Sequence, residues 1–101
     1  MRRVVVTGLG IVSPLGSGLP KSWNSAKEGR SGIAPITRFD AAEFPVRIAG
    51  EVDDFDPSGA IEHKEKKKMD LFIQYGVVSA IEAFKMSGFE ITEDNAERVG
   101  V

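Results

Sequence analysis

The pattern of apolar residues at the start of the chain predicts a buried strand followed by a turn. Val4, Val5 and Val6 form a β-branched run, which is typical of a strand covered on both faces in a parallel sheet. Gly8 and Gly10 come directly after this run. We therefore expect the two glycines to make a tight turn at the end of the strand.

A short segment after this turn predicts a helix over residues 20–28. Pro20 occupies a first-turn position and Gly29 follows the last residue, which is the usual placement of these residue types at helix ends. Leu19, Trp23 and Ala26 fall on one side of the segment and form its apolar side.

The middle of the chain predicts a loop, a short strand and a second helical segment. Residues 30–45 contain glycine, two prolines and isolated apolar anchors, which is typical of a loop. Over residues 46–50, Val46, Ile48 and Gly50 alternate with Arg47 and Ala49, which predicts a short strand with one solvated face. Asp56 followed by Pro57 is typical of an N-cap and a first-turn proline, so we expect a helix to begin there.

The longest apolar pattern predicts a third helix over residues 69–87, ended by Gly88. At about 100° per residue, its charged and amide side chains fall in one arc: Asp70, Gln74, Glu82 and Lys85. The remaining two thirds or so of the circumference is nearly all apolar, far wider than the stripe of an ordinary surface helix. Gly76 lies inside this apolar arc and permits close backbone approach. The helix therefore needs protein on more than one side.

The last residues add a further expected strand. Residues 98–101 begin to show a strand pattern after a polar connection. A parallel sheet needs cover on both faces, and only short helices are available here to supply it. The expected fold class is therefore α/β, with these residues forming the opening segment of a larger α/β protein.

Composition narrows the classes of function. The 101 residues are 42% hydrophobic, which is ordinary for a globular domain. Because 13 basic and 15 acidic residues give a net charge of −2, the overall charge does not attract nucleic acid or an anionic membrane. No apolar run approaches the ~20 residues of a membrane span, and we expect a cytoplasmic protein. The absence of cysteine excludes disulfides, thiolate metal sites and a cysteine nucleophile within these residues. The single histidine, His63, excludes a metal site built on a histidine pair.

The glycines near the start raise one alternative, a nucleotide site. A strand followed by Gly8-Leu9-Gly10 begins a dinucleotide fingerprint, which then requires a third glycine and a helix start at position 13. That position is Ser13, and Pro14 disfavours the α region for it. The shorter T-G-x-x-x-G pattern fails as well, because its last glycine would fall at Val12. A phosphate cradle is the weaker interpretation.

A basic run between the second and third predicted helices is the main candidate site. If this run is helical, Lys64, Lys67 and Lys68 stand at i, i+3 and i+4 and share a face. Residues 63–68 carry a formal charge of +3 in a chain that is negative overall. The run is either a solvated helix face or a docking patch for an acidic partner. Nucleic acid is disfavoured because no aromatic residues are interleaved for stacking, and His63 is more typical of a surface or capping residue than of a catalyst.

Several motifs, in order along the whole chain, carry a family resemblance. They are Arg3-Val4-Val5-Val6-Thr7-Gly8-Leu9-Gly10, Ser13-Pro14-Leu15-Gly16, Trp23, Gly29-Arg30-Ser31-Gly32-Ile33, Phe39-Asp40, Ala49-Gly50, Lys64-Glu65-Lys66-Lys67-Lys68-Met69-Asp70 and Gln74-Tyr75. The sequence resembles the N-terminus of the elongating β-ketoacyl-acyl carrier protein synthases, nearest to the synthase II type of bacterial fatty acid synthesis. The resemblance covers only the start of that family's chain.

The resemblance implies a thiolase-type fold with layered helices and mixed sheets, incomplete in this chain, in an enzyme that is usually a homodimer. Residues 1–101 would be the N-terminal segment of the synthase N-terminal domain, which continues beyond residue 101. The implied reaction is a decarboxylative Claisen condensation of acyl- and malonyl-carrier protein. It needs a thiolate, two imidazoles and an oxyanion hole but no metal or cofactor. In the family these catalytic groups lie beyond this segment, so none is assigned here and the isolated chain is expected to be inactive.

One family site does fall within the segment. The resemblance implies that Lys64, Lys67 and Lys68 contact the acidic recognition helix of acyl carrier protein. Relatives often mix arginine into this patch, whereas this chain uses lysine throughout, which gives attraction without bidentate geometry. Two other classes stay open beside the condensing enzyme: a non-catalytic docking module for an acidic partner, and a nucleotide-binding α/β domain.

Overall fold

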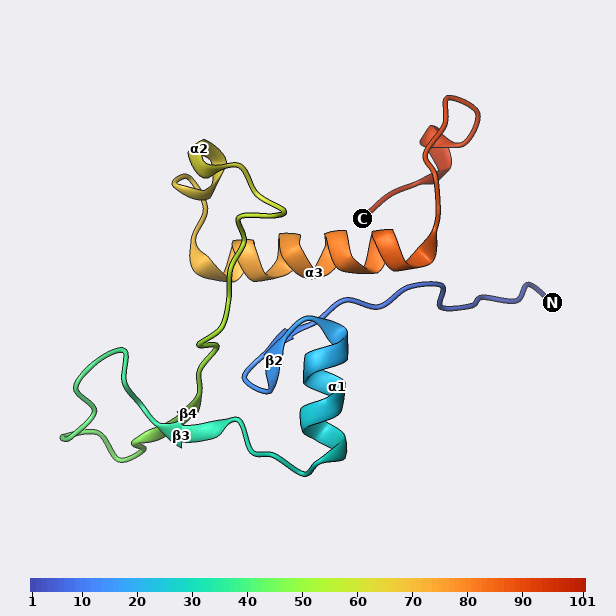
Figure 1. Cartoon of the computed structure of the whole chain (residues 1–101). Helices are drawn as coiled ribbons and strands as arrows, with labels where there is room; N and C mark the ends of the chain where they lie inside the picture. The colour runs from blue at the N-terminus through green and yellow to red at the C-terminus, as the bar shows by residue number, and fades with distance from the viewer.

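The central element is a 17-residue helix, α3, and the other segments lie around it (Figure 1). The computed structural model describes residues 1–101. In chain order the elements are β1 (Val12–Ser13), β2 (Gly16–Ser17), α1 (Leu19–Lys27), β3 (Ile33–Pro35), β4 (Ile48–Gly50), α2 (His63–Lys66), α3 (Leu71–Ser87) and the 3-10 helix η1 (Ala96–Arg98). Helix α2 and the C-terminal segment lie on one side of α3, and the remaining elements lie on the other.

The expected parallel sheet is wrong for this chain. The strands form two antiparallel pairs, β1 with β2 and β3 with β4. The expected strand at Val4, Val5 and Val6 does not form: residues 1–11 have no regular structure, and Val4 is 95% exposed. A strand needs a neighbour for its ladder of hydrogen bonds, and no other strand of the chain pairs with this segment.

The expected turn at Gly8 and Gly10 is also wrong, and close packing replaces it. The segment runs along α3, and a Cβ added to Gly8 would collide with the backbone oxygen of Ala83. A Cβ added to Gly10 would collide with the backbone oxygen of Ser79. Only glycine allows the two backbones to approach this closely.

The first helix is confirmed, beginning one residue earlier than expected. Pro20 lies in its first turn, and Gly29 has the left-handed φ of +67° just after its end. No helix starts at Ser13, as its position before Pro14 predicts; the two residues instead belong to the β1–β2 hairpin, which was not predicted from the sequence. Trp23 on the apolar side of α1 remains exposed.

The middle of the chain departs from expectation at two points. Within the expected loop, β3 pairs with β4, whose three residues confirm the strand predicted over 46–50. The helix expected from Asp56 is a single turn, in which the Asp56 carboxylate accepts from the N–H of Ser58 and the carbonyl of Pro57 accepts from Ala60 and Ile61. The four-residue helix of this region, α2, begins only at His63.

The third helix is confirmed, starting at Leu71 with Asp70 at its N-cap and ending at Gly88, which has a left-handed φ of +63°. The strand expected over 98–101 is wrong. The side-chain oxygen of Asn95 accepts a hydrogen bond from the N–H of Thr92. The backbone carbonyl of Asn95 accepts one from the N–H of Arg98. These bonds fold the segment into η1 instead.

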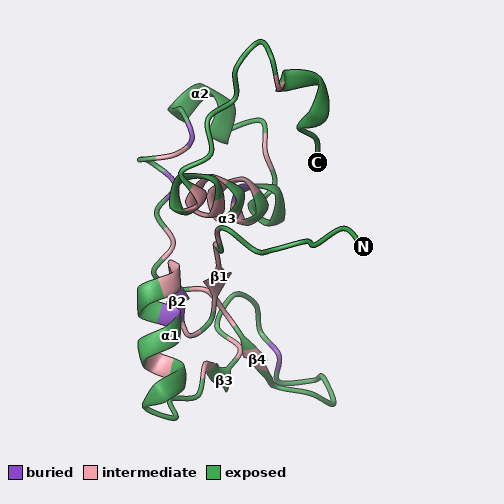
Figure 2. Ribbon diagram, turned by 90° about the vertical axis from the view of Figure 1, so that its right-hand side faces the viewer, coloured by how far each residue is buried: buried purple, intermediate pink, exposed green.

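Very little of the chain is buried (Figure 2). Only 6 of 101 residues are buried, and Phe72 in the apolar arc of α3 is 72% exposed. The accessible surface is 8415 Å², against roughly 5,600 Å² for a compact monomer of this mass. The apolar arc of α3 therefore lacks the cover that its sequence demands. No helix combines the length and the apolar character needed to cross a membrane.

Candidate functional site

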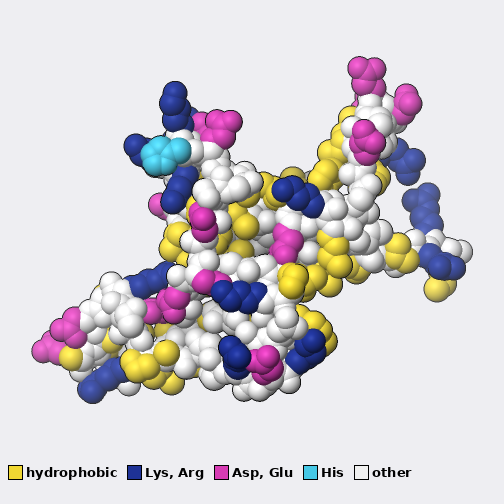
Figure 3. Space-filling model, viewed as in Figure 1, with side chains coloured by type: hydrophobic (Ala, Val, Ile, Leu, Met, Phe, Trp, Pro, Cys, Tyr) yellow, Lys and Arg dark blue, Asp and Glu magenta, His cyan; other side chains and the backbone are white.

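The basic run forms the one-turn helix α2 and the turn after it. Helix α2 begins after Glu62, and Lys67 is its C-cap. Hydrogen bonds from Lys68 N–H to the Glu65 carbonyl and from Met69 N–H to the Lys66 carbonyl continue the turn, so the lysines keep a helical spacing. Lys64, Lys67 and Lys68, hereafter the lysine patch, are all exposed. In Figure 3 basic side chains lie on several sides of the single histidine at this end of the molecule, and acidic side chains lie on another.

Two buried residues lie next to the basic segment, and one of them binds it directly. Ile61, 6% exposed, lies just before α2. Gln74 of α3, also 6% exposed, donates from Nε2 to the carbonyl of Met69 at 3.0 Å and towards that of Lys66 at 3.4 Å. The sequence places Gln74 in the polar arc of α3 but does not reveal this role. The available signal is an amide six residues after the basic run, in the first turn of α3.

The lysines differ in whether a nearby acid already compensates their charge. Lys68 Nζ lies 2.8 Å from Glu65 Oε1. Lys64 and Lys67 form no ion pair and no side-chain hydrogen bond. The pKa of Asp56 is lowered, chiefly by hydrogen bonds from Ser58 and to a smaller extent by the charge of Lys66. Of the four lysines in the run, only Lys68 forms an ion pair, and Lys64 and Lys67 have neither an ion pair nor a noted influence of a nearby acid.

A small hollow beside α2 has mixed character. Its volume is about 160 Å³, and it is lined by Ser58, Ile61, Glu62, His63 and Lys66. Glu62 faces the same space as the two basic side chains, so the hollow is not a dedicated anion site. No group of three or more His, Cys, Asp or Glu side chains is arranged to hold a metal ion.

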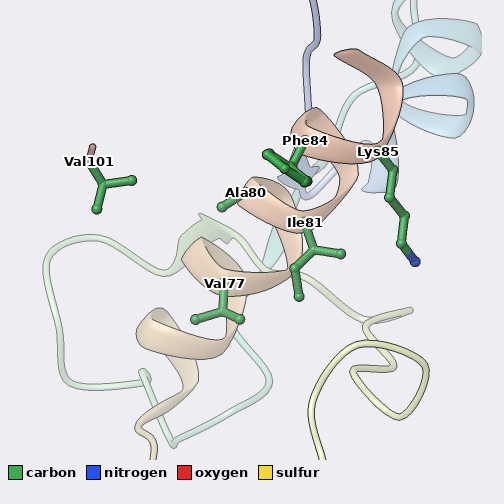
Figure 4. Close-up of a pocket in the computed structure, with 6 residues that line it drawn as sticks. All are labelled: Val77, Ala80, Ile81, Phe84, Lys85 and Val101. Carbon is green, nitrogen blue, oxygen red and sulfur yellow. The ribbon is translucent and has the colours of Figure 1, made fainter. Parts of the chain in front are cut away.

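A larger groove follows the apolar arc of α3 (Figure 4). Its volume is about 400 Å³, and its lining residues are Val77, Ala80, Ile81, Phe84, Lys85 and Val101. Val101, the last residue, stands apart from the helix on the opposite side of the space. Apart from Lys85 the lining is apolar, and it has no acid–base pair. The groove is therefore an uncovered apolar surface rather than a reaction site.

The structure leaves no room for the phosphate of a nucleotide at the glycines near the start. Gly10 packs directly on the backbone of α3, and the hydroxyl of Ser13 accepts a hydrogen bond from Leu15 within the β1–β2 hairpin. The N-terminus of α1 is occupied as well, because Leu19 N–H donates to a carboxylate oxygen of Glu82. A phosphate would have to displace that carboxylate.

Comparison with known proteins gives one consistent result. The sequence profile described as "Beta-ketoacyl synthase, N-terminal domain" matches residues 1–101. The chain is 53% identical over 100 residues to a "3-oxoacyl-[acyl-carrier-protein] synthase 2" of Coxiella burnetii and 54% identical over 100 residues to one of Vibrio harveyi. Each match covers 99% of this chain and 24% of the relative, so the chain spans about a quarter of the length of these curated relatives.

A solved structure agrees with the sequence matches. The structure titled "The ishigamide ketosynthase/chain length factor" superposes with a TM-score of 0.77 at 41% sequence identity. The match covers 93% of this chain and 23% of that chain.

Proposed function

Because the chain belongs to the β-ketoacyl synthase family, we propose that it is the N-terminal segment of a fatty-acid condensing enzyme. Its elements are the first part of a thiolase-like fold, which agrees with the α/β class expected from the sequence. In this proposal the synthase N-terminal domain continues beyond residue 101. The segment provides scaffold and a docking surface, and the catalytic groups come from elsewhere in the enzyme.

The proposed reaction is a decarboxylative Claisen condensation. An acyl group passes from its carrier protein to an enzyme thiolate, and malonyl-carrier protein then loses carbon dioxide to give a carbanion. The carbanion attacks the acyl-enzyme thioester, so a carbon–carbon bond forms and the thiolate leaves. This chain has no cysteine and one histidine, so it supplies neither the nucleophile nor a pair of imidazoles. The isolated chain should therefore show no condensation.

One observation carries the docking part of the proposal. The lysine patch is exposed, and its Lys64 and Lys67 form no ion pair. Gln74 holds the same turn through the backbone carbonyls of Lys66 and Met69. The C. burnetii and V. harveyi relatives are named for action on acyl carrier protein. We infer that the patch binds the acidic helix of acyl carrier protein. We further propose that the complete enzyme is cytoplasmic and works as a homodimer.

A non-catalytic docking module is the second candidate, because the lysine patch alone is enough for that role. The intact mass of the native protein separates the two candidates. A condensing enzyme predicts a species several times heavier than 10.9 kDa that contains cysteine. A native protein of this mass alone supports the docking module.

The direct test is reversal of the patch in the complete synthase by Lys64→Glu, Lys67→Glu and Lys68→Glu together. Each exposed contact is worth ~0.2–1 kcal/mol, and reversal adds repulsion to that loss. The rate with carrier-bound substrate should fall strongly, with a changed salt dependence, because such charges steer encounter. The rate with a small uncharged thioester should change little. Equal losses on both substrates would indicate damage to the fold, and no loss on either would return the lysines to a solvated face.

A further inference from the structure

The ion pair between Glu65 and Lys68 lies inside the proposed docking surface. We propose that Glu65 is an intramolecular competitor of the acidic partner, occupying Lys68 in the free protein and thereby limiting the strength of docking. This inference rests on the proposed function, because it concerns the regulation of the same lysine patch.

The geometry places the competitor within the patch rather than beside it. Glu65 and Lys68 are three residues apart, and Lys68 N–H donates to the Glu65 carbonyl at 3.0 Å, which brings their side chains to the same turn. The carboxylate and the ammonium then meet at 2.8 Å with both side chains at least half exposed. A partner carboxylate that approaches Lys68 must share it with Glu65 or displace Glu65.

The other two lysines of the patch have no acidic side chain paired with their charge. Lys64 and Lys67 have no ion pair and no side-chain hydrogen bond, so a partner gains their full screened attraction on first contact. At Lys68 the partner only exchanges one exposed carboxylate for another, and such an exchange yields little net free energy. Lys64 and Lys67 therefore supply most of the attraction in docking, and Lys68 contributes little while it is paired with Glu65.

The chain offers a matched control for Glu65. Glu62 is also exposed and lies at the N-cap of the same short helix, where its side chain makes no capping hydrogen bond. It takes part in no ion pair. Glu62→Gln and Glu65→Gln remove the same charge from the same element, but only Glu65→Gln releases a lysine.

The test measures the affinity of the complete synthase for acyl carrier protein over a range of salt concentrations. Glu65→Gln should tighten binding by about two- to fivefold, the range of an exposed ion pair. Glu62→Gln should tighten it by less than half as much. Adding Lys68→Gln to Glu65→Gln should remove the gain. Unchanged far-ultraviolet circular dichroism and melting temperature would show that each variant is folded.

The outcomes separate this inference from the proposed function. Equal tightening by Glu65→Gln and Glu62→Gln would mean that only net charge matters, and it would overturn the inference. No tightening by Glu65→Gln would overturn it too, even if Lys64→Glu with Lys67→Glu weakens binding and so supports docking. If that lysine double variant binds acyl carrier protein as well as the wild type does, the docking surface is wrong and the inference fails with it.

Discussion

Glu82 of α3 caps the N-terminus of α1 through Leu19. Its Oε1 accepts a hydrogen bond from Leu19 N–H at 2.7 Å, and its Oε2 accepts one from Ile11 N–H at 2.9 Å. The N-cap of α1 is Gly18, which has no side chain to do this. A negative charge at a helix N-terminus is also favoured by the helix dipole. One carboxylate therefore fixes α3 to both flanks of the β1–β2 hairpin.

Replacing Glu82 by alanine should loosen this hairpin. Glu82→Ala leaves two backbone donors without a protein acceptor, and we expect a loss of about 1–3 kcal/mol. Glu82→Gln retains one acceptor oxygen and should lie between alanine and the wild type. Hydrogen exchange of peptides spanning residues 9–20 in the complete synthase measures the effect. Wild-type protection in Glu82→Ala would show that the two hydrogen bonds do not hold the hairpin.

Adding a methyl group at Gly8 or Gly10 should destabilise the packing of the first segment on α3. The new Cβ atoms would overlap backbone oxygens, which cannot move aside as a flexible side chain can. We expect Gly8→Ala and Gly10→Ala each to cost about 1–3 kcal/mol or more, seen as a lower melting temperature of the complete synthase. Gly59→Ala is the control, because a methyl group added at Gly59 would meet no atom within 4 Å. Equal effects at all three positions would contradict the close-approach explanation.

The position of Asp54 predicts a dependence of stability on pH. Its carboxylate accepts hydrogen bonds from the Lys21 ammonium and from the N–H and hydroxyl of Ser17, and these lower its pKa, the Lys21 contact most strongly. Because the folded-state pKa lies below the unfolded value, the contact stabilises the fold above the unfolded pKa of about 3.9. That stabilisation is lost as the pH falls through the folded-state pKa.

The expected size is small because solvent reaches both partners of the ion pair, whose side chains are 61% (Lys21) and 32% (Asp54) exposed. Asp54→Asn should lower stability near neutral pH by no more than about 1 kcal/mol, and its difference from the wild type should shrink between about pH 5 and pH 2. Melting temperatures of both proteins across this range provide the measurement. Asp53→Asn is the matched control, because Asp53 makes no side-chain hydrogen bond or ion pair. A difference that stays constant with pH would exclude the proposed cause.

The helices could be predicted because their signals are local. Pro20 and Gly29 bound α1, and Gly88 ends α3, all within a few residues of the helices they limit. The basic run was also recognisable from its composition. The strand expected at 4–6 could not be judged in the same way, since a strand forms only against partners that its own residues do not specify.

The hydrogen bonds that polar side chains of α3 make to other segments could not be predicted from the sequence, for a related reason. Gln74 and Glu82 fall in a polar arc that a helical projection assigns to one side, yet each binds backbone groups of another segment. The partners of Glu82 lie 63 and 71 residues earlier in the chain. Helical periodicity shows which side chains share a face, but it does not show which distant backbone that face meets. The Glu65–Lys68 pair, three residues apart, is a contact that spacing alone could have suggested.

The 101-residue chain on its own should not fold cooperatively. Six buried residues and an accessible surface about half as large again as that of a compact monomer leave too little burial to offset the chain entropy. We expect helical far-ultraviolet circular dichroism with weak near-ultraviolet signal, binding of a hydrophobic dye to the exposed apolar arc of α3, and aggregation at high concentration. The complete synthase is the control and should bind little dye. A monomeric 101-residue chain that melts in a single sharp transition would show that this segment needs no further cover.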